Sequence, residues 1–151
     1  MGSTDFISFY DQLDYIAVEF VPGLTQIDDP DIASIRKATN DVCKKVIKPT
    51  ALNSGKPILL APVFYSTDGS NKGNRQPMDF SAPVDMQEQV DEWEGFFQAI
   101  LDLNYISAVS TWGYWREDSH EDLDMLTSAS IRAKPAKKAV KLWFEIYNDS
   151  F

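Results

Sequence analysis

Several residues that could bind or transform a ligand stand where apolar runs of the sequence end. Glu19 lies near the end of one run, Tyr65 at the end of a second and Trp112 at the end of a third. A carboxylate such as Glu19 can bind a hydroxyl group or act as a base, and an open aromatic ring offers a flat apolar face to a ligand. Each also has a purely structural reading, as a paired carboxylate or an aromatic packed at the rim. Further candidates that follow the second and third runs are Asp68, Tyr114 and Trp115.

Other kinds of catalytic site lack the residues they need. His120 is the single histidine and Cys43 the single cysteine, so a zinc site built on His and Cys is excluded. A Ser-His-Asp triad would depend on His120, which stands in the charged run 116–124 and is expected in a solvated loop. A lone cysteine forms no disulfide within the chain. We therefore expect no metal and no cofactor.

Composition indicates a folded protein and excludes some partners. The 151 residues are 44% hydrophobic and 25% charged, which is ordinary for a globular domain. The net charge of −9 argues against nucleic acid and against an anionic membrane surface, whereas a neutral ligand is compatible with it. No apolar run has the length of a membrane span, and residues 1–4 show no signal-peptide core. We expect a soluble protein whose compartment the sequence leaves open.

Three short apolar runs predict strands, and three amphipathic segments predict helices. The runs at residues 13–21, 57–65 and 105–112 are rich in β-branched and aromatic residues and are nearly continuous. This pattern is typical of strands covered on both faces, as in a parallel sheet. Helices are predicted near 30–47, 86–102 and 135–148. The alternating order predicts an α/β fold of three βα units, in which residues 1–151 form a single unit.

Local signals suggest where the helices begin and end. Asp29-Pro30 offers a cap and a first-turn proline, and Pro49 is expected to end that helix. Asp85 and Glu88 form a plausible capping pair for the second helix, and the third is expected to begin at Lys134-Pro135. The aromatic residues along the second and third helices are interpreted as core.

The carboxyl ends of parallel strands share one edge of a sheet, and ligands bind at that edge. A polar stretch at 66–81 follows the second run and is expected to be a long loop there. Three strands alone leave unpaired edges. We expected apolar faces, including Ile16, Val18, Leu60 and Val109, to need cover from self-association or from a complementary barrel segment.

Several segments together resemble the C-terminal part of a glycoside hydrolase (β/α)8 barrel of the family 113, β-mannanase-like group. The segments that carry this resemblance are 14–22, 56–60, 65–69, 85–93, 105–107, 111–115 and 130–136. The resemblance implies the last units of a TIM barrel, with Trp112 ending the eighth strand and Arg132-Ala133-Lys134-Pro135-Ala136 starting the last helix.

The resemblance also implies a carbohydrate ligand. Glycosidases use two carboxylates across the scissile bond, and Trp112 would be a sugar platform with Tyr65, Asp68, Tyr114 and Trp115 close by. The family's nucleophile is a Glu that aligns with Pro62 or Ala61, neither of which is a carboxylate. The family's acid/base belongs to a strand outside this chain, so Glu19 is the one catalytic candidate. The resemblance thus implies a segment that acts on or binds a polysaccharide or oligosaccharide and is catalytically incomplete.

Three functions remain open at this point. The chain could be part of a glycoside hydrolase whose other strands supply catalysis. It could be a non-catalytic carbohydrate-binding or structural relative. It could also be a small flavodoxin-like module, although residues 21–24 lack the glycine spacing of a phosphate-binding loop.

Overall fold

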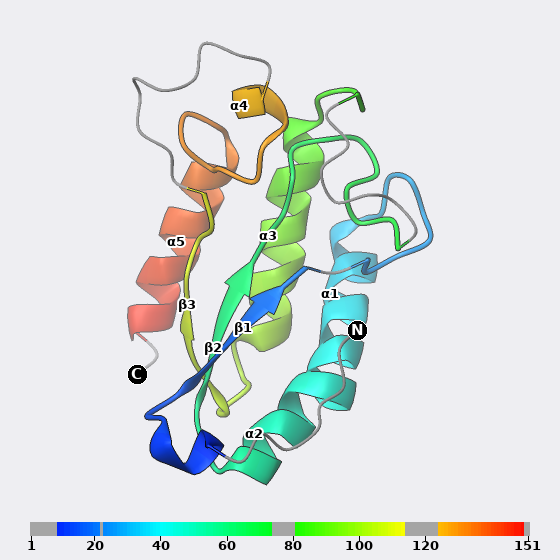
Figure 1. The fold of residues 1–151 in the computed structure, drawn as a ribbon. Coiled ribbons are helices and arrows are strands. Elements are labelled where there is room, and N and C mark those ends of the chain that lie inside the picture. Colours follow the sequence, from blue (N-terminus) through cyan, green and yellow to red (C-terminus); the bar gives the residue numbers. More distant parts are fainter. Residues whose placement is uncertain (1–8, 22, 74–80, 114–123, 150–151) are drawn as a thin grey trace.

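The computed structural model describes residues 9–21, 23–73, 81–113 and 124–149. Its strands β1 (Ile16–Phe20), β2 (Ile58–Pro62) and β3 (Ile106–Val109) form one sheet in the order β1-β2-β3 (Figure 1). Both neighbouring pairs are parallel. The predicted α/β fold, with parallel strands alternating with helices, is confirmed.

The strands are shorter than the apolar runs that predicted them. Leu13 follows a short 3-10 turn, η1 (Tyr10–Gln12), and is not paired with β2, because the pairing of β1 begins at Ile16. Beyond the regular strands the pairing continues by single bonds, with the Val63 N–H donating to the Phe20 carbonyl at 3.0 Å and the Ser110 N–H to the Leu60 carbonyl at 2.9 Å. These bonds hold the carboxyl ends of neighbouring strands together.

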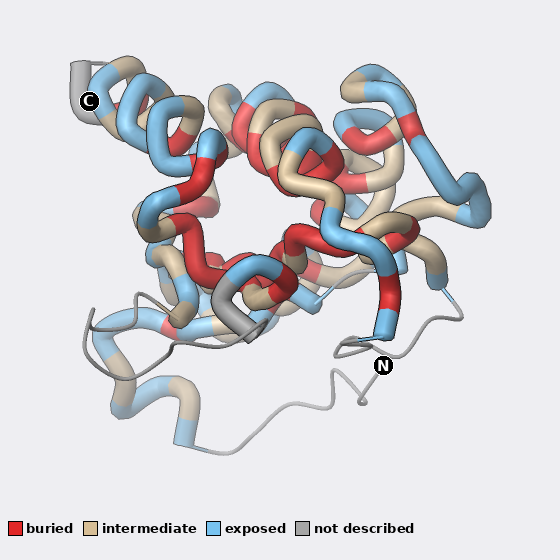
Figure 2. The backbone as a smooth tube through the Cα atoms, turned by 90° about the horizontal axis from the view of Figure 1, so that it is seen from above, coloured by how far each residue is buried: buried red, intermediate tan, exposed pale blue. Residues whose placement is uncertain are grey.

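The long helices lie on one face of the sheet (Figures 1 and 2). They are α1 (Ile32–Val42), which continues through the π-helical turn η2 (Cys43–Ile47) into α2 (Lys48–Ser54), then α3 (Met86–Ile100) and α5 (Ala136–Asp149). Helix α3 contacts α1 on one side and α5 on the other. The short helix α4 (Asp124–Thr127) lies beyond the carboxyl ends of the strands.

Two predicted helix boundaries are wrong. The N-cap of α1 is Asp31, whose carboxylate accepts the Ser34 N–H at 2.7 Å, and not Asp29. Pro49 does not end the helical segment, because the wide turn η2 starts a new helix in which Pro49 falls in the first turn. An amide there needs no partner within the helix, so proline is tolerated. The segment ends at Gly55, which has φ 65°.

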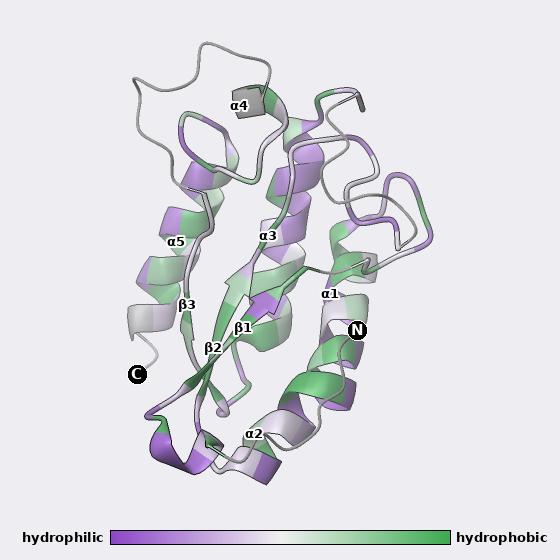
Figure 3. Ribbon diagram, viewed as in Figure 1, coloured by the Kyte–Doolittle hydropathy of each residue, from purple (hydrophilic) through white to green (hydrophobic). Residues whose placement is uncertain are grey.

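The core lies between the sheet and the helices. Figure 2 shows buried residues where the two layers face each other, and Figure 3 shows hydrophobic residues along β2. Aromatic rings pack on α3 and between α3 and α5: Phe97 stacks on Trp93 and on Trp143, with ring centroids 5.6 and 5.7 Å apart. The interpretation of the helix aromatics as core is confirmed for these residues.

The sheet face expected to be apolar and uncovered carries other residues. Ile16 and Leu60 are buried in the core, and Val18 and Val109 pack against it, because this is the face that the helices cover. The opposite face presents Ala17 and Glu19 of β1 and Ser107 of β3, all exposed. No helix in the described part of the chain is long and apolar enough to cross a membrane.

Candidate functional site

Glu19 lies on the uncovered face of the sheet near its carboxyl edge. Because side chains alternate along a strand, burial of Phe20 against the helices directs Glu19 to the other side. Its register partner on β2 is Ala61. The next β2 residue, Pro62, is buried. Ala61 and Pro62 are the positions where the resemblance implied a nucleophile, and neither side chain has a carboxyl group.

Tyr65 lies within electrostatic reach of Glu19. The Tyr65 side chain is half-buried beyond the end of β2. Burial raises the pKa of the Tyr65 hydroxyl above its ordinary value, and the negative charge of Glu19 raises this pKa further. The fold thus brings together two predicted site residues from different strands.

Asp68 contacts the segment that leads into α3 and has no described interaction with Glu19. Its backbone N–H donates to the Pro83 carbonyl at 3.0 Å, and Thr67 forms an antiparallel bridge with Val84. The Asp68 charge contributes to raising the pKa of Glu88 on α3. None of the interactions described for Asp68 connects it with Glu19.

Trp112 follows β3 and keeps 43% of its surface exposed. The backbone turns directly after it, since Gly113 has φ 72°, a conformation that favours glycine. Tyr114, Trp115 and His120 lie outside the described residues.

A buried polar cluster that the sequence analysis missed joins the loop after β2 to α3. Glu88 and Glu92 are 3% and 1% exposed and lie one helical turn apart. The Gly69 N–H donates to Glu88 Oε2 at 2.6 Å, while Ser70 Oγ and Asn71 Nδ2 donate to Glu92 Oε1. Glu88 was interpreted as the capping partner of Asp85, but its carboxylate binds the loop instead. Asp85 alone caps the helix, accepting from the N–H groups of Gln87 and Glu88.

A second polar network fixes the loop before α5. Lys134, 6% exposed, donates to Ser66 Oγ at 2.7 Å and to the Ser128 carbonyl at 2.6 Å. Burial lowers the pKa of the Lys134 ammonium to about 8. Gln89 adds a bond from Nε2 to the Phe64 carbonyl at 2.8 Å. A Ser–Lys pair can support nucleophilic catalysis, but Ser66 is fully buried, so we assign the pair a structural role.

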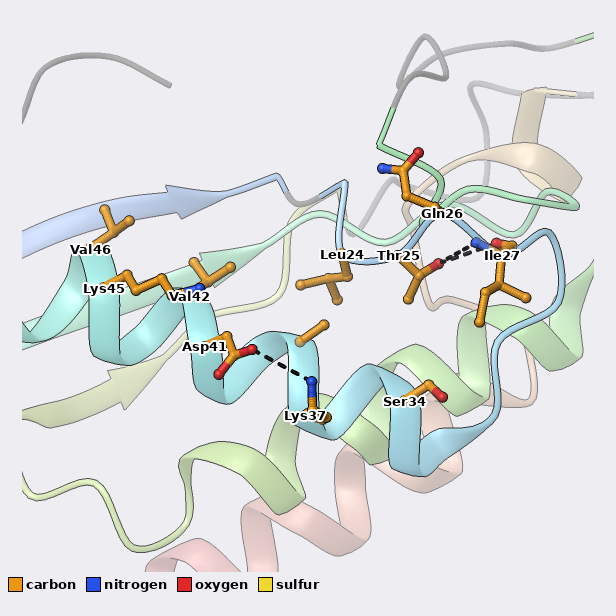
Figure 4. Close-up of a pocket in the computed structure, with 11 residues that line it drawn as sticks. Leu24, Thr25, Gln26, Ile27, Ser34, Lys37, Asp41, Val42, Lys45 and Val46 are labelled. Carbon is orange, nitrogen blue, oxygen red and sulfur yellow. Dashed lines mark hydrogen bonds and ion pairs between the residues drawn. The ribbon is translucent and has the colours of Figure 1, made fainter.

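Two hollows are lined by described residues. A groove of about 590 Å³ runs between the loop Leu24–Ile27 and α1, with aliphatic Leu24, Val42 and Val46 along it (Figure 4). A smaller one, of about 320 Å³, lies at the amino ends of the strands beside Tyr15 and Leu59. Neither contains a predicted site residue. Among the described residues, no three His, Cys, Asp or Glu side chains converge as a metal site would require.

Comparison with solved structures identifies the architecture. The GH113 β-mannanase AaManA from Alicyclobacillus acidocaldarius, in complex with ManMIm, matches 98% of this chain with a TM-score of 0.63 and 19% sequence identity. A GH113 β-1,4-mannanase matches 92% of this chain with a TM-score of 0.63 and 17% identity, and a complex of such an enzyme gives 0.61 and 17%. No protein-family model and no curated protein sequence matches the chain.

The match covers 42% of AaManA and 41% of each of the other two enzymes. This chain therefore spans about two fifths of their length, and sequence identities below one fifth describe the fold alone. Three parallel strands in sequence order, with helices on one face, are one part of such a barrel. The chain has the fold of part of a TIM barrel of the GH113 β-mannanase type.

Proposed function

We propose that this chain forms part of a carbohydrate-binding surface of a glycoside hydrolase-like barrel and does not hydrolyse glycosides by itself. The observation that carries the proposal is the position of Glu19 and Tyr65 at the carboxyl ends of the paired strands β1 and β2, where the charge of Glu19 raises the pKa of the Tyr65 hydroxyl. The carboxyl edge of the sheet is where TIM-barrel proteins bind their ligands. The partly exposed Trp112 follows the third strand at the same edge.

The proposed ligand is a neutral oligosaccharide of the β-mannan type. Sugar rings bind by stacking their C–H faces on aromatic rings and by hydrogen bonds to carboxylates and hydroxyls. Trp112 would supply the ring, and Glu19 and the Tyr65 hydroxyl would bind sugar hydroxyls. The AaManA complex, which shares the fold, supports this ligand class.

Catalysis would need more than the described residues offer. A retaining glycosidase places two carboxyl groups about 5–5.5 Å apart. Glu19 is one carboxylate on the uncovered face, and Ala61 and Pro62 leave the end of β2 without a second. Hydrolysis would therefore require a carboxylate from a complementary barrel segment, which we propose as the partner of the uncovered face. A second copy of this chain is the alternative partner.

Titration with manno-oligosaccharides tests the site, with binding followed by tryptophan fluorescence and by calorimetry. We expect Trp112→Ala to weaken binding by about 1–3 kcal/mol, by analogy with aromatic stacking on bases, which is roughly 5- to 150-fold in Kd. Tyr15→Ala is the matched control, because Tyr15 is also exposed, at 55%, but stands at the opposite edge of the sheet.

Equal affinity in the wild type and in Trp112→Ala would contradict the proposed surface. In the same samples we expect no release of reducing sugar above background. Turnover that Glu19→Gln abolishes would show instead that the chain is a complete catalyst.

A further inference from the structure

In the buried cluster, the side chains of Glu92 and Asn71 share one hydrogen bond, but each also has an oxygen atom without a hydrogen-bond partner. Asn71 Nδ2 donates to Glu92 Oε1, yet Glu92 Oε2 and Asn71 Oδ1 have no hydrogen-bond partner. Both residues are 1% exposed. Buried polar atoms without partners are costly and call for an explanation. Both of these atoms are acceptors when Glu92 is ionised, so a proton is what would join them.

We propose that Glu92 is protonated in the folded protein and that its Oε2–H donates to Asn71 Oδ1, closing an acid–amide pair that latches the loop after β2 onto α3. One proton then satisfies both atoms. Oε1 becomes the carbonyl oxygen of the acid, which accepts from Ser70 Oγ and Asn71 Nδ2 as the structure shows. The inference does not depend on the proposed carbohydrate site.

The surroundings of Glu92 favour its neutral form. Burial raises the pKa of Glu92 well above its ordinary value, and the charges of Glu88 and Asp85 raise it further, against the opposing hydrogen bonds. Asp68 adds negative charge from the loop, where it acts on Glu88. Helix α1 packs on α3 through the uncharged Ile35.

The nearby ammonium groups are engaged elsewhere. Lys72, in the same loop, pairs with Asp28, and Lys134 donates to Ser66 and Ser128. Among the described residues, neither Glu88 nor Glu92 has a cationic partner. A buried carboxyl group without a cation takes up a proton.

The loop that binds Glu92 is itself bound to a second loop. The Asn71 carbonyl accepts the Thr25 N–H at 3.1 Å, and the Gly73 N–H donates to the Thr25 carbonyl at 2.9 Å. The loop between β1 and α1 is therefore hydrogen-bonded to the loop whose Ser70 and Asn71 side chains bind Glu92. Ionisation of Glu92 would set a buried carboxylate oxygen against Asn71 Oδ1, so both loops at the carboxyl edge should loosen.

The direction of the pH effect follows from linkage. The folded chain keeps this proton at pH values where the unfolded chain, with an ordinary glutamate pKa of 4.5, has released it. The contribution to stability is complete below that value and is lost as pH rises toward the folded pKa. Glu88 acts in the same direction, since burial raises its pKa to about 7.

Glu92→Gln tests the latch, because its amide N–H₂ can donate permanently to Asn71 Oδ1. We expect the melting temperature of the wild type to fall between about pH 5 and about pH 8, and that of Glu92→Gln to fall less, exceeding the wild type by about 3 °C or more at the upper pH. Glu145→Gln removes the same charge from an exposed position on α5 and should follow the wild type.

Infrared spectroscopy supplies a readout that does not rely on stability. At neutral pH the wild type and Glu145→Gln should show the C=O stretch of a protonated carboxylic acid. Glu92→Gln should keep only a weaker band from Glu88, whose pKa is raised to about 7. Asn71→Ala keeps Glu92 but removes the acceptor of its proton, so the band should shift.

Two results would overturn the inference. One is the absence of an acid band in the wild type together with stabilisation by Ca²⁺ that EDTA reverses and Glu92→Gln lacks, since a cation would then occupy the place of the proton. The other is a melting temperature of Glu92→Gln that keeps the full pH dependence of the wild type.

Discussion

Gly95 of α3 lies against α1 with no room for a Cβ atom, and Gly95→Ala tests whether this close packing matters. A Cβ atom at position 95 would lie 2.7 Å from Ile35 Cγ2, 2.8 Å from Ile35 Cβ and 3.0 Å from the Ile32 carbonyl oxygen. Two of these atoms belong to the rigid part of α1, so a change of rotamer cannot relieve the contact. Helix α1 must move away from α3.

Two effects of opposite sign compete in this variant. Replacing glycine by alanine inside a helix stabilises it by about 0.5–1 kcal/mol, whereas overpacking a core costs about 1–3 kcal/mol. Because the obstruction includes backbone, we place the cost in the upper part of that range. The net expectation is a loss of about 1–2 kcal/mol, or a fall of about 2–8 °C in the melting temperature.

Urea unfolding followed by tryptophan fluorescence measures this loss in a double-mutant cycle with Ile35→Ala. Ile35→Ala alone should cost about 2–5 kcal/mol, and with Gly95→Ala the losses should fall short of additivity by about 0.5–3 kcal/mol. Gly55→Ala is the matched control: its φ of 65° strains alanine, but nothing lies within 4 Å of the new Cβ. It should be additive with Ile35→Ala. A Gly95→Ala variant more stable than the wild type would refute the reasoning.

Two further predictions concern the core. Phe97→Ala should cost about 3–5 kcal/mol, because the Phe97 ring stacks on Trp93 and Trp143 at the contact of α3 with α5; urea unfolding measures it, and a loss below about 1 kcal/mol would contradict this role. The thiol of Cys43, which is fully buried and has a pKa raised by burial to about 11, should react with a thiol reagent at the rate of unfolding, and rapid reaction in native buffer would contradict that expectation.

Periodicity predicted the parallel sheet because nearly continuous apolar runs need cover on both sides. It misassigned the covered face, since such a run gives no alternation from which to choose. Ile16 and Leu60 were expected on the uncovered side and lie in the core. The boundary at Pro49 failed for a different reason: a proline signals a helix end only while the hydrogen-bond pattern is regular, and the π-helical turn before it changes that pattern.

Part of the candidate site could be predicted from the sequence. The rule that parallel strands share a carboxyl edge predicted Glu19 and Tyr65 at one edge, and the parallel pairing of β1 with β2 agrees with it. The cluster of Glu88 and Glu92 was missed because charged residues are ordinarily read as solvated. A signal existed in the sequence, since Glu92 directly precedes Trp93, which was interpreted as core, and Glu88 lies one helical turn before Glu92. Only the fold shows which loop donates to them.

The positions of the carboxyl groups in the described part of the chain are the reason for proposing binding without catalysis. Glu88 and Glu92 are buried and bound by a loop, so neither can reach a glycosidic bond. Glu19 faces outward but has Ala61 beside it on β2, where a second carboxylate would have to stand. Cleavage by a glycosidase needs a pair of carboxyl groups. Under the proposed function, Glu19, Tyr65 and Trp112 would therefore bind a sugar, and hydrolysis would need a second carboxylate in addition to the carboxyl groups described.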